Sequence, residues 1–119
     1  YDSNMITYDD FKKVEIRAGK ILSAEKIPDT DKLLKLSVDL GEKDEQGNSR
    51  PRTIVSGISL YFPDCSVLVG KTCMFVTNLE PRTIKGFESN GMLFAVSNSQ
   101  GGFSILEPNE TITPGSLAG

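Results

Sequence analysis

Short stretches of alternating apolar and polar residues, separated by turn signals, constrain this chain more than any other feature. Residues 34–40 alternate without interruption, which is the period-two pattern of a half-buried strand. Residues 14–21 alternate less strictly, and we expect this strand to bend at Gly19 and to continue toward Lys26. The side chains of the second strand that we expect to face away from the core are Lys35, Ser37 and Asp39.

Three further strands and one short helical segment follow the same logic. Strands are predicted over 52–56, 72–77 and 91–97, with a short terminal hairpin arm over 101–106. The polar stretch 41–50 contains Gly47-Asn48 and is expected to form a solvated hairpin loop. The stretch 57–67 contains Pro63 and fits a short helix or an irregular crossover. Near the N-terminus, Thr7 is expected to cap a short helix within 8–13.

The order of these elements predicts an all-β fold. Five strands with a short helix between the third and the fourth form the element order of the OB-fold, a five-stranded Greek-key barrel whose face and loops bind oligonucleotides. A generic small barrel or a sandwich fits the same order of strands. The residues themselves must therefore distinguish these alternatives.

Length and composition favour a single domain. The 119 residues, 38% of them hydrophobic, suffice for one core, and we expect one domain over 1–119 with its core at about 11–112. No apolar run approaches the roughly 20 residues of a membrane helix, so no membrane contact is expected. Residues 1–4 lack the features of a signal peptide, and the chain does not begin with Met, so we expect a cytoplasmic protein that is a fragment of a longer one.

The residues usual in catalytic centres are scarce. His is absent, and Cys65 and Cys73 have no CxxC spacing, which excludes the usual zinc sites and His-based triads. We expect both cysteines to be reduced thiols, with Cys73 inside a strand, and a disulfide is the alternative. Asp29 and Asp31 are expected to lie in a surface turn, because two carboxylates are too few to favour a metal site. The sequence thus predicts neither an enzyme nor a cofactor.

The stretch 78–92 combines residue types that suit a binding loop. It holds two cations, two amides, two glycines and a methionine between apolar strand-like runs, and such residues bind phosphates and exposed bases. The formal net charge of -3 argues against a strongly basic polyanion binder. A local basic face remains compatible with this charge, because most of the cations lie between Lys12 and Arg52.

Several separated motifs together resemble one family. They are residues 16–21 (IRAGKI), 27–33 (IPDTDKL), 53–58 (TIVSGI) and 88–92 (ESNGM). The chain resembles the tRNA-binding domain appended to methionyl-tRNA synthetases and other synthetases. The same family includes small bacterial structure-specific tRNA-binding proteins and synthetase cofactors related to endothelial monocyte-activating polypeptide II. The resemblance runs in order over roughly residues 11–112.

The resemblance implies an OB-fold that binds tRNA by shape and charge and has no chemistry of its own. Its implied role is to increase the tRNA affinity of an aminoacyl-tRNA synthetase, methionyl first, whose catalytic domain is joined in cis or bound in trans. Relatives also form homodimers, so a homodimer is a further implied partner. The tRNA-binding residues carried over by motif are Arg17, Lys32, Lys35, Asn78, Arg82, Lys85, Ser89 and Met92.

Each of these residues also has a purely structural interpretation. Arg82 and Lys85 are equally compatible with solvated surface charges, and Met92 with a core position. Ser89 also fits a turn cap, Asn78 a hydrogen bond to its own loop, and Arg17 an ion pair with Glu15 or Glu25. Phe87 is the only aromatic residue within 78–92, so binding is expected to depend little on base stacking.

A protein-interaction role is the competing function. Relatives of the family act as cytokine-like or chaperone-like modules, and the segment 13–17 matches the position of the signalling segment in the former. Steeply salt-dependent tRNA binding favours the first function, whereas binding of a client protein without RNA favours the second.

Overall fold

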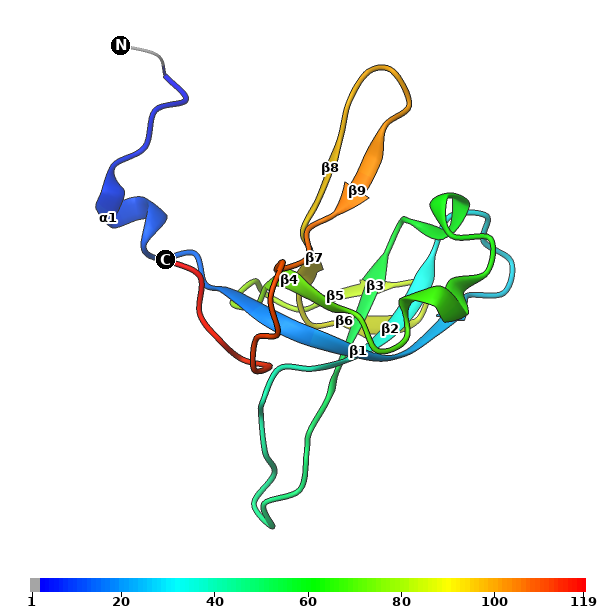
Figure 1. The fold of residues 1–119 in the computed structure, drawn as a ribbon, viewed down its shortest axis with the longest axis horizontal. Coiled ribbons are helices and arrows are strands. Elements are labelled where there is room, and N and C mark those ends of the chain that lie inside the picture. The colour runs from blue at the N-terminus through cyan, green and yellow to red at the C-terminus, as the bar shows by residue number, and fades with distance from the viewer. Residues whose placement is uncertain (1–2) are drawn as a thin grey trace.

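A five-stranded antiparallel sheet forms the body of the protein. The computed structural model describes residues 3–119. Tyr1 and Asp2 lie outside the described residues, and with them lies half of the 1–4 segment in which no signal peptide is predicted. The sheet has the order β3-β2-β1-β4-β7 and curls into a nearly closed barrel (Figure 1). Its strands are β1 (Ile16–Lys26), β2 (Leu34–Asp39), β3 (Arg52–Ser56), β4 (Thr72–Val76) and β7 (Met92–Leu93).

The predicted all-β OB-fold is thereby confirmed, because the first strand pairs with both the second and the fourth as this barrel requires. Between β3 and β4 the chain makes two short 3-10 helices, η1 (Ser59–Tyr61) and η2 (Cys65–Leu68). Near the N-terminus, α1 (Tyr8–Phe11) is capped as expected, since the Thr7 hydroxyl accepts a hydrogen bond from the Asp10 amide at 3.1 Å.

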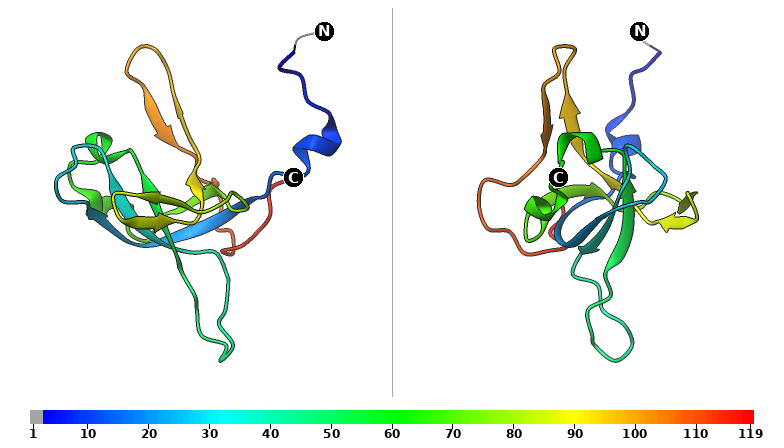
Figure 2. Two further views of the ribbon diagram at one scale, coloured as in Figure 1. Left: turned by 180° about the vertical axis from the view of Figure 1, so that it is seen from behind. Right: turned by 90° about the vertical axis from the view of Figure 1, so that its right-hand side faces the viewer.

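Two pairs of short strands lie outside the main sheet. They are the hairpin of β5 (Arg82–Ile84) with β6 (Phe87–Ser89), and the hairpin of β8 (Ala95–Ser97) with β9 (Phe103–Ile105). The predicted single strand over 91–97 is therefore divided at Phe94 into β7, which belongs to the barrel, and β8, which does not. Figure 2 shows the β8–β9 hairpin and the polar 41–50 loop extending from the body in opposite directions.

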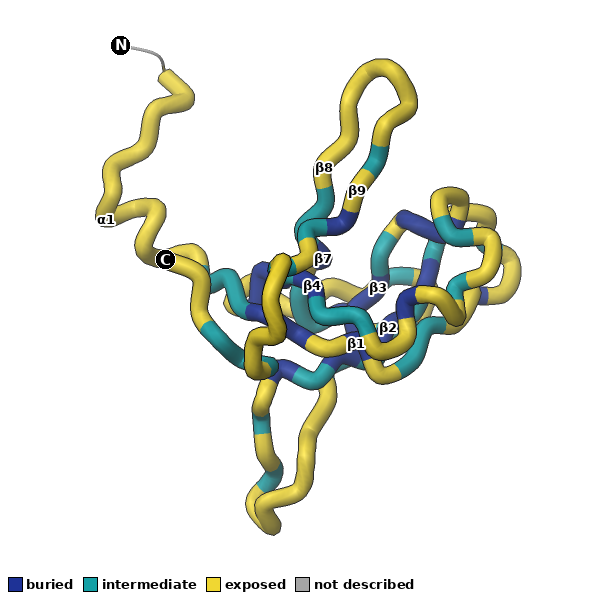
Figure 3. The backbone as a smooth tube through the Cα atoms, in the orientation of Figure 1, coloured by how far each residue is buried: buried dark blue, intermediate teal, exposed yellow. Residues whose placement is uncertain are grey.

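The core follows the alternation of the strands. In β2 the buried positions alternate with partly exposed ones, so Lys35, Ser37 and Asp39 face away from the core as predicted. Buried positions gather in the middle of the barrel, whereas the protruding segments are exposed (Figure 3). The core cluster comprises Ile21, Leu34, Leu36, Val38, Leu40, Ile54, Ile58, Leu68, Cys73, Phe75, Leu93 and Ile105.

The irregularity in β1 lies beyond the position expected from its glycine. The pairing with β2 shifts between Ile21 and Ser23, so Leu22 forms the bulge. Gly19 has a different task, because a Cβ there would stand 2.7 Å from Val38 Cγ1 and 2.9 Å from Phe75 Cδ2. The glycine is needed for close packing under the core rather than for a bend.

Candidate RNA-binding surface

The binding loop predicted over 78–92 is built around the β5–β6 hairpin. Its turn is Lys85-Gly86, with φ angles of 51° and 84°, and a two-residue turn with both φ angles positive suits the twist of a hairpin. The apolar residues Ile84 and Phe87 face each other across the turn. The sequence signal for this hairpin is a dipeptide that ends in glycine, Lys85-Gly86, between the apolar residues Ile84 and Phe87. Only a loop was predicted here from the sequence.

Ser89 fixes this hairpin to the barrel. Its buried hydroxyl accepts a hydrogen bond from the Val55 amide at 2.9 Å and donates to the Gly91 carbonyl at 3.3 Å. The next residue continues the contact, because the Asn90 amide donates to the Thr53 carbonyl at 2.9 Å. The segment thus supplies hydrogen-bond partners to the open side of β3 and completes the barrel wall. The role of Ser89 in the structure is to support the surface.

The cations of the hairpin are open to solvent. Arg82 and Lys85 are both exposed. Arg82 pairs with Ser89 and Ile84 pairs with Phe87, so these four side chains lie on the same side of the two-stranded ribbon. Lys85 stands in the turn at the tip.

Lys35 brings a third cation to the hairpin. Its Nζ atom lies 4.9 Å from the centre of the Phe87 ring, within the range of a cation-π contact. The same atom lies 3.7 Å from a Glu25 carboxylate oxygen, a partly exposed pair that contributes little to stability. Strand β2 and the β5–β6 hairpin therefore present Lys35, Phe87 and Arg82 on one side, and we call this set with Lys85 the hairpin face.

Met92 and Lys32 are two further predicted residues that lie at the surface of the protein. Met92 is 44% exposed, so it is a surface residue and not a core residue, although its neighbour Leu93 is buried. Lys32 is exposed in the turn before β2, where its carbonyl accepts a hydrogen bond from the Ser59 amide at 2.9 Å. Its side chain is not placed against the hairpin by any contact described for residues 3–119.

Asn78 and Arg17 serve to hold the chain ends to the barrel. The Asn78 side chain accepts from the Glu15 amide at 2.8 Å and donates to the Lys13 carbonyl at 2.5 Å, so its partner is the N-terminal segment and not its own loop. Arg17 donates to Glu15 at 2.6 Å and to the Gly115 carbonyl at 2.7 Å. The ion pair with Glu15 is the structural alternative weighed for Arg17, and contact of either residue with RNA stays a prediction.

Arg52, at the same end of the barrel, was not among the site residues predicted from the sequence. It forms a two-pronged ion pair with Glu42, with both N–O distances at 2.8 Å. Hydrogen bonding from Arg52 lowers the pKa of the Glu42 carboxyl below its usual 4.5. Its remaining bonds go to carbonyls of Thr77 and Asn90. An arginine at a strand start gives no sequence signal for such a network.

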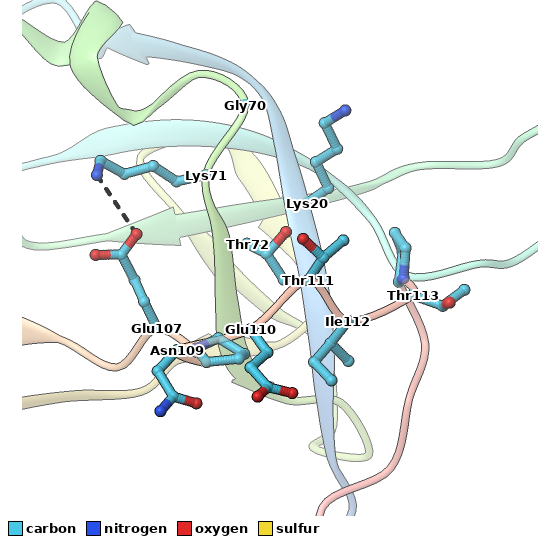
Figure 4. Close-up of a pocket in the computed structure, with 12 residues that line it drawn as sticks. Lys20, Gly70, Lys71, Thr72, Glu107, Asn109, Glu110, Thr111, Ile112 and Thr113 are labelled. Carbon is cyan, nitrogen blue, oxygen red and sulfur yellow. Dashed lines mark hydrogen bonds and ion pairs between the residues drawn. The ribbon is translucent and has the colours of Figure 1, made fainter.

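A cavity of about 840 Å³ lies beside β1 and β4 (Figure 4), where Lys71 and Glu107 pair at 3.4 Å. Residues 3–119 contain no group of three or more His, Cys, Asp or Glu side chains able to hold a metal ion. Both cysteines are free thiols. No helix among these residues is long and apolar enough to cross a membrane.

The fold and the hairpin face together define a class of protein. It is a small antiparallel barrel of the OB type that carries a cationic hairpin on its wall. Within this class the chain belongs to the family described as "Putative tRNA binding domain", whose model matches residues 16–117.

Known proteins agree with this assignment. The chain is 46% identical over 112 residues to the methionine–tRNA ligase of Methanoregula boonei, covering 93% of this chain and 15% of the ligase. The chain thus spans about 15% of the length of the curated relatives it matches. It superposes with a TM-score of 0.84 on the crystal structure of a "MetRS related protein" from Pyrococcus horikoshii, at 35% identity over 97% of this chain and 98% of that one.

A second solved structure carries a different name. The CsaA chaperone protein of Picrophilus torridus superposes with a TM-score of 0.80 at 28% identity, over 97% of this chain and 100% of that chain.

Proposed function

We propose that this protein is a noncatalytic tRNA-binding domain that holds folded tRNA by shape and charge. The supporting observation is the hairpin face, where Lys35 lies over the Phe87 ring and the exposed Arg82 and Lys85 belong to the same hairpin as that ring. Three cations close together on one surface suit the phosphates of a folded RNA. With one partly buried ring in place of a row of exposed ones, the same face suits base stacking poorly.

We further propose that the domain increases the tRNA affinity of a methionyl-tRNA synthetase, joined in cis or bound in trans, in the cytoplasm. The relatives named as methionine–tRNA ligases match this chain over a small part of their length, which fits an appended domain. A site that adds phosphate contacts to a catalytic domain raises the joint affinity through effective concentration. Pairing of two copies would double the cationic surface in the same way.

Titration of labelled tRNA by fluorescence anisotropy tests the proposal, with a single-stranded RNA of equal length as the competitor and a series of salt concentrations. We expect preference for folded tRNA and an affinity that falls linearly on a log-log plot against salt. The double variant R82A/K85A should lose most of the affinity. Equal affinity of the two RNAs, or an unchanged affinity in the double variant, would contradict the proposal.

A protein-interaction function is the second candidate. It is favoured by the likeness to a chaperone structure and by exposed apolar side chains such as Leu60 and Tyr61 on η1. Such side chains mark interaction sites when they are contiguous. Binding of an unfolded client protein that RNA does not compete away would support this candidate.

A further inference from the structure

We propose that Arg52 is a positioning residue for RNA binding, which orders the β5–β6 hairpin without touching the RNA. The inference rests on the proposed function and adds a residue to it. Between β4 and β7 the chain leaves the main sheet, and this excursion carries Arg82 and Lys85. Arg52 reaches it from β3.

Arg52 binds both ends of that excursion through a single nitrogen. Its Nη1 donates to the Thr77 carbonyl at 2.6 Å and to the Asn90 carbonyl at 3.3 Å. Thr77 directly follows β4 and Asn90 directly follows β6. The two ends of the segment 78–89 are therefore held together by one side chain.

The other side of the guanidinium is anchored to Glu42. Nε and Nη2 donate to the two carboxylate oxygens at 2.8 Å each, a planar geometry that arginine provides and lysine does not. Both side chains of this pair are less than 30% exposed. The pair therefore fixes the direction from which Nη1 meets the two carbonyls.

Counting donors separates positioning from direct contact. An arginine has five N–H groups, and four hydrogen bonds from Arg52 are formed within the protein. About one N–H remains for a phosphate, which needs two for the usual paired contact. A cavity of about 530 Å³ is lined by Arg50 and Arg52 together with Pro81 and Asn90. Arg50 is exposed there, whereas Arg52 is partly buried.

Positioning and phosphate contact predict different salt behaviour. If Arg52 only orders the hairpin, its loss leaves the hairpin less ordered in the free protein. RNA binding must then order it at a cost in conformational entropy, while the complex contacts the same phosphates. The affinity then falls at every salt concentration and the log-log slope stays the same. Loss of a phosphate contact would instead reduce the slope by about 0.7 to 0.9.

The test compares R52Q and R52K, which both lose the fork and of which only R52K keeps the charge, with R50Q, which loses a neighbouring charge and keeps the fork. We expect both variants of Arg52 to bind tRNA about 10-fold more weakly, as for the loss of one hydrogen bond to a charged group. The wild-type salt slope should be kept even in R52Q, where the charge is absent. R50Q should keep the wild-type affinity at high salt. E42Q is a second variant that keeps Arg52 but weakens its anchor. Its affinity for tRNA should also be lower than that of the wild-type protein.

Hydrogen exchange in the absence of RNA tests the positioning role by itself. The Val55 amide donates to Ser89 and the Asn90 amide donates to the Thr53 carbonyl, so both bonds join β3 to the segment that carries the hairpin. In R52K these two amides should exchange faster, while those of Leu36 and Phe75 in the core stay protected. Unchanged exchange of Val55 and Asn90 in R52K, or a salt slope of R52Q reduced by about one phosphate contact, would overturn the proposal. Failure of the wild-type protein to bind tRNA would instead overturn the proposed function.

Discussion

Ser89 supplies a hydrogen bond to β3 along the edge that does not pair with β2. The Val55 amide is buried and donates to the Ser89 hydroxyl at 2.9 Å. A buried amide that loses its acceptor costs the full desolvation of that group. The observed task of Ser89 is therefore structural, because its hydroxyl bonds the hairpin segment to β3.

We expect S89A to lower the free energy of unfolding by about 1 to 3 kcal/mol, because the Val55 amide remains buried without an acceptor. Urea denaturation measures the change. S104A is the matched control, since the Ser104 side chain is bonded only to the neighbouring Ile105 carbonyl, and it should change stability by less than about 0.5 kcal/mol. Equal effects of the two variants would show that the Val55 bond is unimportant.

Cys73 gives a second prediction at this scale. Burial raises the pKa of its thiol to about 11, and only the thiolate is nucleophilic. We therefore expect a thiol reagent at pH 8 to leave Cys73 unmodified in the folded protein and to modify it after denaturation, as mass spectrometry of the modified peptide would show. Rapid modification of Cys73 in the folded state would mean that β4 is open to solvent.

At the scale of elements, the turn of the β5–β6 hairpin combines a backbone task with a charge. Lys85 has a φ of 51°, in the left-handed region that asparagine occupies more readily than lysine. The turn geometry and the charge are therefore separable by substitution. Few positions on the hairpin face allow this separation.

We expect K85N to keep or slightly raise stability and to weaken tRNA binding, because Asn-Gly favours the same turn while one cation is lost. The salt slope of binding should fall by about 0.7 to 0.9. Anisotropy titrations across the salt series, together with urea denaturation, measure both quantities. A full wild-type affinity would show that Lys85 stays clear of the RNA phosphates.

Close packing under β1 predicts a strong effect at Gly19. A Cβ there meets Val38, Leu40 and Phe75 within 3.0 Å, so G19A should lower the free energy of unfolding by about 1 to 3 kcal/mol. G57A is the control, because a Cβ at Gly57 would meet nothing within 4 Å and the φ of this residue is not positive. Thermal denaturation of both variants tests the difference.

For the whole molecule, two arginines at one end of the barrel combine local ion pairs with hydrogen bonds to segments that are distant in sequence. Arg52 on β3 pairs with Glu42 of the 41–50 loop and bonds to the Thr77 carbonyl just after β4. Arg17 on β1 pairs with Glu15 and bonds to the Gly115 carbonyl of the C-terminal segment. The Arg17 hydrogen bond is the main cause that lowers the pKa of Glu15, and the Arg52 bond does the same for Glu42.

These lowered pKa values predict acid sensitivity. A carboxyl whose pKa is lower in the folded state contributes stability above its unfolded pKa, near 4.5 for Glu42, and this contribution is lost as the pH falls through the folded pKa. We expect the unfolding free energy to decline below about pH 4.5, and E42Q to decline less steeply. Urea denaturation at pH values from 6 to about 3 measures both slopes, and equal slopes would contradict the assignment.

The order of the main strands, the core face of β2 and the residues of the cationic segment could all be predicted from the sequence. Alternation decides these features locally, because each side chain of a strand faces the core or the solvent in turn. The family resemblance was likewise carried by short local motifs, and the matched family model confirms it.

The tasks of the polar side chains became visible only in the folded molecule. Asn78 and Ser89 of the segment, and Arg52 on β3, each bond to at least one residue that lies between 25 and 65 positions away in the chain, and no local pattern encodes such a partner. The same holds for Lys35 beside Phe87 and for the strand division at Phe94. Hydrogen bonds and close packing act between atoms that are near in space, so residue type alone left a supporting serine and a solvent-exposed lysine equally plausible as contacts for RNA.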